Sequence, residues 1–324
     1  MIRFVLPLAL AAGLALPAGA DVVDEALDAH VLPRIEALAE TTAALAGTAE
    51  ATCDRDALRP TWSDAFDAWA AASHLRLGPI EEGGQAVAFW PDDRDFTARG
   101  LRLLLSGGPD ALAPDAMARA SVAARGLLAL ERLLWEAEAS EAACAALSAL
   151  AADLARTAAA IRDGWTGPDG FAATMRAAGA PGNTRFLAPE EAEAALYTAL
   201  ATGLEFAAEQ RLGRPLGTFD RPRPARAEAW RSGSSLRAVT ASLRALRELA
   251  ALFGPAPRTL TALDGAIARA EALDDPALAG VAEPAGRIRV EALQSEIRDA
   301  LRLAAEEIGA ARGLPTGFNA QDGD

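Results

Sequence analysis

The sequence predicts an all-α protein, and three observations favour this fold class. Hydrophobic residues make up 51% of the 324 residues but aromatic residues only 5%, so the core must consist mainly of Ala and Leu. Ala and Leu are strong helix formers, whereas the β-branched residues that favour strands are sparse. Apolar residues recur at helical spacing, and no stretch alternates with the period of two that a half-buried strand shows.

The N-terminal residues 1–20 have the pattern of an export signal. Arg3 is followed by a nearly unbroken apolar run from Phe4 to Leu16 and then by small residues that a signal peptidase recognises, Pro17-Ala18-Gly19-Ala20. We therefore expect a signal peptide cleaved after Ala20 and a periplasmic mature protein. A retained N-terminal anchor is the alternative. No other stretch reaches the roughly 18 to 20 apolar residues of a membrane span.

Helical periodicity then predicts a series of helices. They span residues 22–48, 56–74, 93–105, 114–136, 141–163, 189–211, 225–253, 259–272 and 287–311. Two of them begin with Pro followed by an acidic residue, which is typical of a helix start. The short connections between long helices predict antiparallel packing in bundles.

The most loop-like segment, residues 164–188, contains the runs Gly-Trp-Thr-Gly-Pro-Asp-Gly and Gly-Ala-Pro-Gly-Asn-Thr. Clusters of Gly, Pro and Asn are typical of connections between compact units. We therefore predict an N-terminal helical bundle over residues 21–163, a linker over 164–188, and a C-terminal helical bundle over 189–324.

Charge and cysteine content limit the function classes. The net charge of −14 argues against a nucleic-acid partner, which requires a basic surface. In an oxidising compartment the two cysteines, Cys53 and Cys144, are expected to form a disulfide, with two unpaired thiols as the alternative. A bridge between them would close a loop of about 90 residues and stabilise the protein by roughly 4 kcal/mol.

Glu131 is the most informative candidate site residue. The residues three and four positions before and after it are apolar and lie on the same helix face: Leu127, Leu128, Leu134 and Trp135. An unpaired carboxylate in such a stripe is costly and tends to bind a proton, a cation or an Arg side chain. One interpretation is a metal or substrate contact in a cleft, and the other is an ion pair with an Arg of a neighbouring helix.

The two histidines of the chain, His30 and His74, are also candidates. If the first two long helices form a hairpin that turns near Cys53, the two rings lie at levels that differ by only about 3 Å. They would then face each other near one end of the bundle, with Arg76 close by. A metal site of both histidines and Glu131 is one interpretation, and helix caps or solvated side chains are the other.

Two further segments combine aromatic and polar residues. Phe89 and Trp90 stand side by side in an irregular stretch before Asp92, where they either plug the end of the bundle or form a binding surface. The segment around Trp230, Arg231 and Ser232 supplies Arg and Ser donors. They are expected to bind an anion, to pair with Glu131, or to form an ordinary polar helix face.

In their order and spacing, several motifs resemble those of the imelysin family, a peptidase family of exported bacterial proteins. They are Asp67-Ala-Trp69, His74-Leu-Arg76-Leu-Gly78-Pro79, Phe89-Trp90-Pro91-Asp92, Gly126-Leu-Leu-Ala-Leu-Glu131, Ala229-Trp230-Arg231-Ser232-Gly233 and the tail from Gly317-Phe318-Asn319 to Asp322-Gly323-Asp324. The resemblance implies a bilobal fold of two four-helix-bundle-like halves with a cleft between them. It also implies iron-linked physiology at the cell surface or in the periplasm.

The resemblance further implies a metal site with the motif Gly-x-His-x-x-Glu. The matching positions here are Gly126, Leu128 and Glu131, so the His is absent. A Leu side chain cannot bind metal, and a zinc hydrolase normally needs three protein ligands and a water position. This departure argues against both metal binding and peptidase activity.

These inferences support one leading hypothesis, a non-catalytic periplasmic binding component in iron or metal uptake or homeostasis. Iron or another divalent metal would be the cofactor, held in part by Glu131, and periplasmic iron-transport, haem or redox proteins the partners. One alternative is a metallopeptidase that uses Glu131 with His74 or His30; another is a scaffold that docks a partner through the loop of Phe89 and Trp90. The expected cleft residues are Glu131, Arg76, His74, Trp90, Asp92, Trp230, Arg231 and Ser232.

Overall fold

The computed structural model describes residues 18–314, and within this range the chain is helical, without strands. The sole pairing of extended backbone there is an isolated bridge between Thr218 and Arg221. The all-α prediction is confirmed. The predicted signal peptide lies, apart from residues 18–20, outside the described residues, and so does the acidic tail that begins at Gly317.

A first group of helices covers the N-terminal half of the chain. Its elements are α1 (Ala18–Ala26), the π-helical turn η1 (Leu27–Val31), α2 (Leu32–Ala51), α3 (Arg55–Ala72), α4 (Pro79–Val87), α5 (Phe96–Ser106), α6 (Gly108–Ala111), α7 (Pro114–Arg119), η2 (Val122–Ala124), α8 (Gly126–Trp135), α9 (Glu141–Thr166) and α10 (Phe171–Arg176). The sequence did not predict α4 or α10, because each is short and rich in Gly or Ala.

A second group covers the C-terminal half. Its elements are α11 (Pro189–Glu205), the π-helical turn η3 (Phe206–Leu212), α12 (Gly213–Leu216), η4 (Pro224–Arg226), α13 (Ser235–Leu252), α14 (Pro257–Glu271), η5 (Ala279–Ala282), α15 (Pro284–Ala304), η6 (Ala305–Gly309) and α16 (Ala310–Arg312). The predicted helices that begin near 189, 259 and 287 correspond to α11, α14 and α15.

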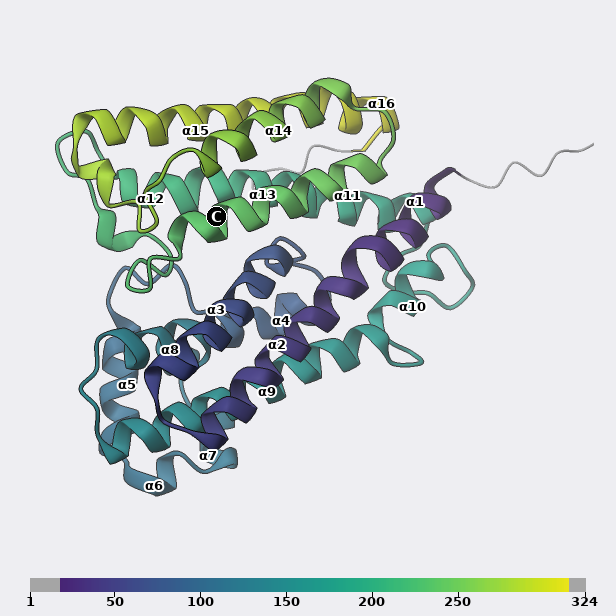
Figure 1. Ribbon diagram of the computed structural model, residues 1–324. Coiled ribbons are helices and arrows are strands. Elements are labelled where there is room, and N and C mark those ends of the chain that lie inside the picture. The colour runs from purple at the N-terminus through teal and green to yellow at the C-terminus, as the bar shows by residue number, and fades with distance from the viewer. Residues whose placement is uncertain (1–17, 315–324) are drawn as a thin grey trace, which may run out of the picture.

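The two groups occupy different parts of the molecule (Figure 1). In the first, α2 packs along α3 and α9; in the second, α14 lies between α13 and α15. The groups meet where α13 packs on α3 and where α1 packs on α11. Their division into separate domains over residues 21–163 and 189–324, with a cleft between two lobes, stays a prediction. The expected linker contains α10, whose Phe171 packs edge-on against Trp165 and Phe186.

Two predicted helices are wrong in part, and residues with positive φ explain both. The helix expected over 114–136 is interrupted between α7 and α8, where Gly126 has φ of +75°. The helix expected over 225–253 begins only at Ser235, since Ala229 and Gly233 adopt φ of +50° and +69° in the preceding turns. Left-handed backbone ends a helix, and residues of the second interruption line the pocket described below.

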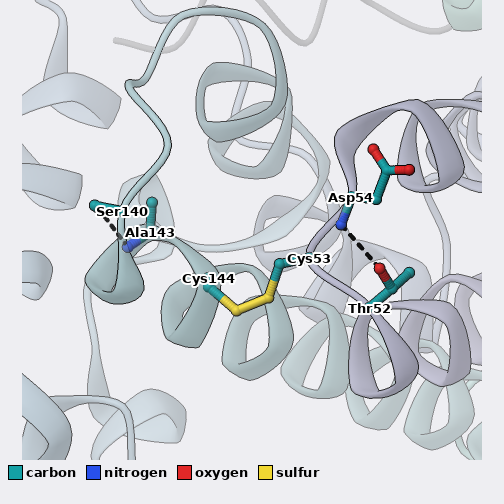
Figure 2. The surroundings of a disulfide bond; sticks show 6 residues. All are labelled: Thr52, Cys53, Asp54, Ser140, Ala143 and Cys144. Atoms are coloured by element: carbon teal, nitrogen blue, oxygen red, sulfur yellow. Dashed lines mark hydrogen bonds between the residues drawn. A yellow bond between two sulfur atoms is a disulfide. The ribbon is translucent and has the colours of Figure 1, made fainter.

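A disulfide joins Cys53 and Cys144, as the sequence predicts, and connects the loop after α2 to the first turn of α9 (Figure 2). The Cα atoms are 5.4 Å apart and the bridge spans 91 positions of sequence. The side chain of Ser140 caps α9 by accepting a hydrogen bond from the backbone N–H of Ala143, at 3.1 Å.

The segment Glu141–Arg176, which includes α9, is long and apolar enough to cross a membrane by length and composition alone. Core helices of globular proteins have the same properties. Here α9 packs against α2, α4 and α8. Its Asp153 is 2% exposed and pairs with Arg125 at 2.6 Å and with Arg156 at 3.1 Å. Both the packing and the buried ion pairs identify α9 as a core helix.

Candidate ligand-binding site

Glu131 lies in the middle of α8 and is only 1% exposed. Its apolar neighbours on the same helix face are buried too: Leu127, Leu128 and Leu134. The helix is anchored at its start, where the indole N–H of Trp62 donates to the carbonyl of Leu127 at 2.8 Å. The spacing on the sequence therefore places this carboxylate correctly inside the protein.

Gly126 sets the position where α8 begins. A Cβ at this residue would lie 2.3 Å from the carbonyl oxygen of Val87 and 2.5 Å from that of Ala86. Because its φ is also positive, neither the space nor the backbone conformation allows a larger residue. The Gly of the family motif therefore has a structural role: it lets α4 and α8 approach closely and so places Glu131 in register.

The partner of Glu131 comes from the second group of helices. The backbone N–H of Ser232 donates a hydrogen bond to Glu131 Oε1 at 2.8 Å, across 101 positions of sequence. Burial raises the pKa of the Glu131 carboxyl; the hydrogen bonds from Ser232 and the charge of Arg231 oppose that rise only in part. Of the alternatives open to the Trp230 segment, pairing with Glu131 is the one observed, although through a backbone N–H.

Glu131 and Leu128 line a pocket of about 360 Å³ that is formed by elements of both groups. Its walls include the rings of Phe89, Trp90 and Trp230. The charged side chains around it already form ion pairs with one another: Arg214 and Arg226 with Asp93, Arg132 with Asp95 and Glu136, and Arg231 with Glu136. Glu131 differs from these acids, because no ion pair joins it to an Arg within the described residues.

Trp90 and Asp92 lie in the same pocket but have structural contacts as well. Trp90 is half-buried and packs edge-on against Phe206, with the ring centroids 5.6 Å apart. Asp92 accepts hydrogen bonds from the backbone N–H groups of Phe96 and Thr97, both at 2.8 Å, and so caps α5. Partial burial raises the pKa of Asp92, but these hydrogen bonds outweigh it and hold that pKa below its usual range.

The structure brings the two histidines together, as the hairpin argument predicts. Their Nε2 atoms are 2.8 Å apart, and the side chains are 1% and 4% exposed. Burial, followed by the charges of His74 and Arg34, lowers the pKa of His30 to about 2. Burial and then the charges of Arg34 and Arg211 lower that of His74 to about 3. Both rings are therefore neutral, and one N–H donates to the other ring.

The histidine pair does not join Glu131 in a metal site. Within residues 18–314 no three His, Cys, Asp or Glu side chains are grouped so that they could hold a metal ion. The environment of the pair is also unfavourable for a cation, since the charged groups that act on it are Arg34 and Arg211. In the pocket, Leu128 stands where the family motif has its His. These donors do not fit the metal that the family implies.

The remaining predicted site residue, Arg76, lies in a second pocket of about 130 Å³ that shares Trp90 with the first. Its guanidinium stacks on the ring of Phe206, 4.0 Å from the centroid. Sequence reasoning did not find the acids Asp93 and Asp95 or the buried pair of Arg211 with Glu228. The signal for Arg211 was present, since Ala residues stand three and four positions before it, as Leu residues do before Glu131.

Over residues 18–314, the fold and the pockets define an all-helical protein with one buried, ion-pair-free carboxylate at a junction of two helix groups. The chain belongs to the imelysin family, whose sequence profile matches residues 31–304. It is similar to an imelysin-like protein from Psychrobacter arcticum, with a TM-score of 0.74 and 20% identity over 94% of this chain and 98% of that one.

A second similar structure is that of a protein assigned as an iron-regulated protein A precursor from Parabacteroides distasonis. The TM-score is 0.74 and the identity 13%, over 91% of this chain and 97% of that one. At such identities the likeness extends to the fold. No curated protein matches the sequence.

Proposed function

We propose that this protein is a non-catalytic binding component of iron or metal handling in the periplasm, and that the pocket around Glu131 receives the ligand. One observation carries the proposal: a buried carboxylate without an ion-pair partner opens onto a pocket of about 360 Å³, beside a Leu in place of the metal-binding His. Ligand pockets usually have volumes of about 300–1,000 Å³.

The side chains around this pocket suit binding better than catalysis. The aromatic rings of Trp90 and Trp230 offer flat apolar surfaces, and Glu131 supplies a hydrogen-bond acceptor or a negative charge. A metal hydrolase needs three protein ligands, and Glu131 with Leu128 supplies one. The residues present therefore support a pocket that holds a ligand through shape, stacking and a single carboxylate.

The iron role rests on relatedness. The protein from Parabacteroides distasonis carries iron regulation in its name, and the imelysin family is linked to iron physiology. Iron complexes are accordingly the first ligands to test. Since Glu131 is one carboxylate rather than a full set of ligands, we expect the protein to bind iron inside a complex that brings its own donors.

The test is a titration of the mature protein, starting at Asp21, with ferrous ion, ferric citrate and haemin, followed by calorimetry and by thermal stabilisation. We expect binding of an iron complex, and Glu131→Gln is expected to reduce the affinity by about tenfold or more, because a charged hydrogen bond is lost. The matched control is Glu40→Gln, an exposed acid of α2. If no iron species binds, or if both variants bind like the parent, the proposal is wrong.

A second variant separates binding from metal catalysis. Leu128→His restores the family motif next to Glu131, so it is expected to increase the affinity for Zn²⁺ or Fe²⁺ measured against a chelating indicator dye. The parent protein should show no such tight site. Proteolysis by the parent that a chelator stops and that Glu131→Gln abolishes would favour the metallopeptidase instead.

The docking alternative has less support from the side chains. Phe89 and Trp90 are half-buried, and each ring packs against another aromatic ring, Phe96 and Phe206 respectively. Such rings stabilise the loop from within rather than projecting toward a partner. Docking through this loop therefore stays a prediction; retention of a periplasmic partner by the parent but not by Trp90→Ala would support it.

A further inference from the structure

The second pocket, with a volume of about 130 Å³, has a different chemistry from the first. Its apolar walls come from Trp69, Ile80, Trp90 and Phe206, which belong to α3, α4, the following loop and η3. Two guanidinium groups line it, those of Arg76 and Arg211, and so do two carboxylates, those of Glu81 and Glu228. Like the first pocket, it is formed by elements of both helix groups, so a molecule in it would touch both.

Arg211 is fully occupied by protein partners. It is 3% exposed, and its Nε donates to Glu228 at 2.6 Å. Its Nη1 donates to Ser242, and its Nη2 donates to the hydroxyl of Ser73 at 3.0 Å. The charge of Arg211 is balanced by the equally buried Glu228, so this pair makes no net demand for an external ion.

Arg76 has no such partner. Arg76 is exposed overall; within residues 18–314 no hydrogen bond or ion pair engages its side chain, and its one marked contact is the stack on Phe206. Arg211 lies over the same ring, 5.2 Å from the centroid. The desolvation of its guanidinium, and then the charge of Arg211, lower the pKa of Arg76, while the charge of Glu228 raises it. An Arg remains protonated under such conditions.

We infer that the pocket of Arg76 binds the carboxylate group of a small organic molecule, with Arg76 as its ion partner. A guanidinium presents two parallel N–H donors that match the two oxygens of a carboxylate. Both carboxylates of the lining lie next to other arginines, Glu228 next to Arg211 and Glu81 next to Arg185 at 3.8 Å, so Arg76 is left without an acid among the described residues. Its single positive charge matches one carboxylate, whereas a phosphate dianion would leave a charge uncompensated. The apolar walls suit the carbon part of such a molecule, and the volume restricts that part to a few atoms.

The carboxylate can belong to a free small acid or to one arm of a metal complex with an organic acid. Because the two pockets share Trp90, the second source would connect this pocket with the proposed iron role. The inference itself concerns only the carboxylate and holds without iron.

The test is calorimetric titration of the mature protein with sodium propionate, at constant ionic strength, and with the uncharged amide propionamide as the matched ligand. We expect propionate to bind and propionamide not to bind measurably. Arg76→Gln is expected to weaken propionate binding by about tenfold or more. The control is Arg102→Gln, which removes an exposed Arg of α5 that likewise has no ion pair in the described chain and should leave the affinity unchanged.

A second variant, which blocks the pocket without changing the net charge, tests whether propionate binds in this pocket. Gln85 is exposed and lines the same pocket, so Gln85→Trp should fill it without altering a buried contact and should also abolish propionate binding. Equal binding of propionate to the parent and to both pocket variants would overturn the inference, and so would equal binding of propionamide.

Ferric citrate and free citrate distinguish the two sources. Binding of propionate and citrate, but not of ferric citrate, would support a free acid as the source of the carboxylate. Binding of ferric citrate that Arg76→Gln weakens supports the metal complex as the source. If ferric citrate binds and depends on Glu131 but not on Arg76, the iron role stands and the metal complex is not the source of the carboxylate; the propionate titration alone then decides the inference.

Discussion

The two pockets that share Trp90 differ in the charge that they offer to a ligand: one contains an acidic side chain, and the other a basic side chain, that has no ion-pair partner among the described residues. In the larger pocket Glu131 is buried and accepts a hydrogen bond from the backbone of Ser232. In the smaller one Arg76 stacks on an aromatic ring and is free of ion pairs with described residues. Arg211 and Glu228, which also line the smaller pocket, form a complete buried ion pair.

The contrast shows which charges at these pockets are structural. Arg211 and Glu228 satisfy each other, and through Ser73 and Ser242 they also tie η3 to the first group of helices and to α13. Glu131 and Arg76 stay available to a ligand, because each lines a pocket and has no ion-pair partner in the described part of the chain. A buried ion pair is costly to break, so substitutions should affect stability at one kind of site and binding at the other.

The largest effect is expected for Arg211→Met, which leaves Glu228 buried without its cation. Loss of one member of a buried pair typically costs about 3–5 kcal/mol. The measurement is the midpoint of urea unfolding, with the slope unchanged. The double variant with Glu228→Leu should recover much of the loss, and Arg102→Met should have almost no effect. If Arg211→Met lowers the free energy of unfolding by less than about 1 kcal/mol, the ion pair of Arg211 with Glu228 does not have the structural role that distinguishes it from Glu131 and Arg76.

A decrease in pH should destabilise the protein through its neutral histidine pair, which lies beside the ion pair of Arg211 with Glu228. The folded pKa values of His30 and His74, about 2 and about 3, lie below the ordinary value of 6.5. The unfolded chain therefore binds protons below pH 6.5 that the folded protein does not bind. The stability from this pair is complete above pH 6.5 and falls with decreasing pH, by about 2 kcal/mol for two histidines between pH 6.5 and 5.5.

The check is urea unfolding at these two pH values for the parent and for the double variant His30→Phe, His74→Phe. The variant should lack this part of the pH dependence. An equal loss of stability in both proteins would mean that other groups carry the acid response and that the histidines titrate normally.

The smallest effect is expected for Glu131→Gln. Burial favours the uncharged carboxyl, and the amide oxygen of Gln can still accept the hydrogen bond from Ser232. At pH 8 the free energy of unfolding should therefore rise, by about 1 kcal/mol. Glu228→Gln is the matched comparison and should lower it. A marked loss of stability for Glu131→Gln would mean that Glu131 has a cationic partner in the folded protein. It would then contradict the role of Glu131 as a ligand contact.

Much of the site could be predicted from local spacing. The apolar residues around Glu131 indicated its burial, and the similar distances of His30 and His74 from Cys53 along the chain indicated that the two rings meet. The same spacing rule, applied to Arg211 among its Ala neighbours, would have identified a second buried charge.

Other features depend on backbone geometry that composition does not reveal. The helix expected over 114–136 is interrupted because Gly126 needs a positive φ where α8 approaches the carbonyls of α4. The segment before Ser235 reads as helical, yet it forms turns that aim the N–H of Ser232 at Glu131. In both places a contact across the chain outweighs local helix propensity.

The sequence by itself determined the helical class, the pairing of its two cysteines and the burial of Glu131. The helical class follows from composition, the disulfide from the number of cysteines, and the burial of Glu131 from the spacing of apolar residues along one helix. All three can be taken from the sequence without knowing how the helices pack. Only the tertiary structure decided which charges have partners. Glu228 and its partner Arg211 are separated by 17 positions of sequence, and Glu131 and Ser232 by 101 positions. Such pairing depends on how the helix groups pack, because ion pairs form between neighbours in space.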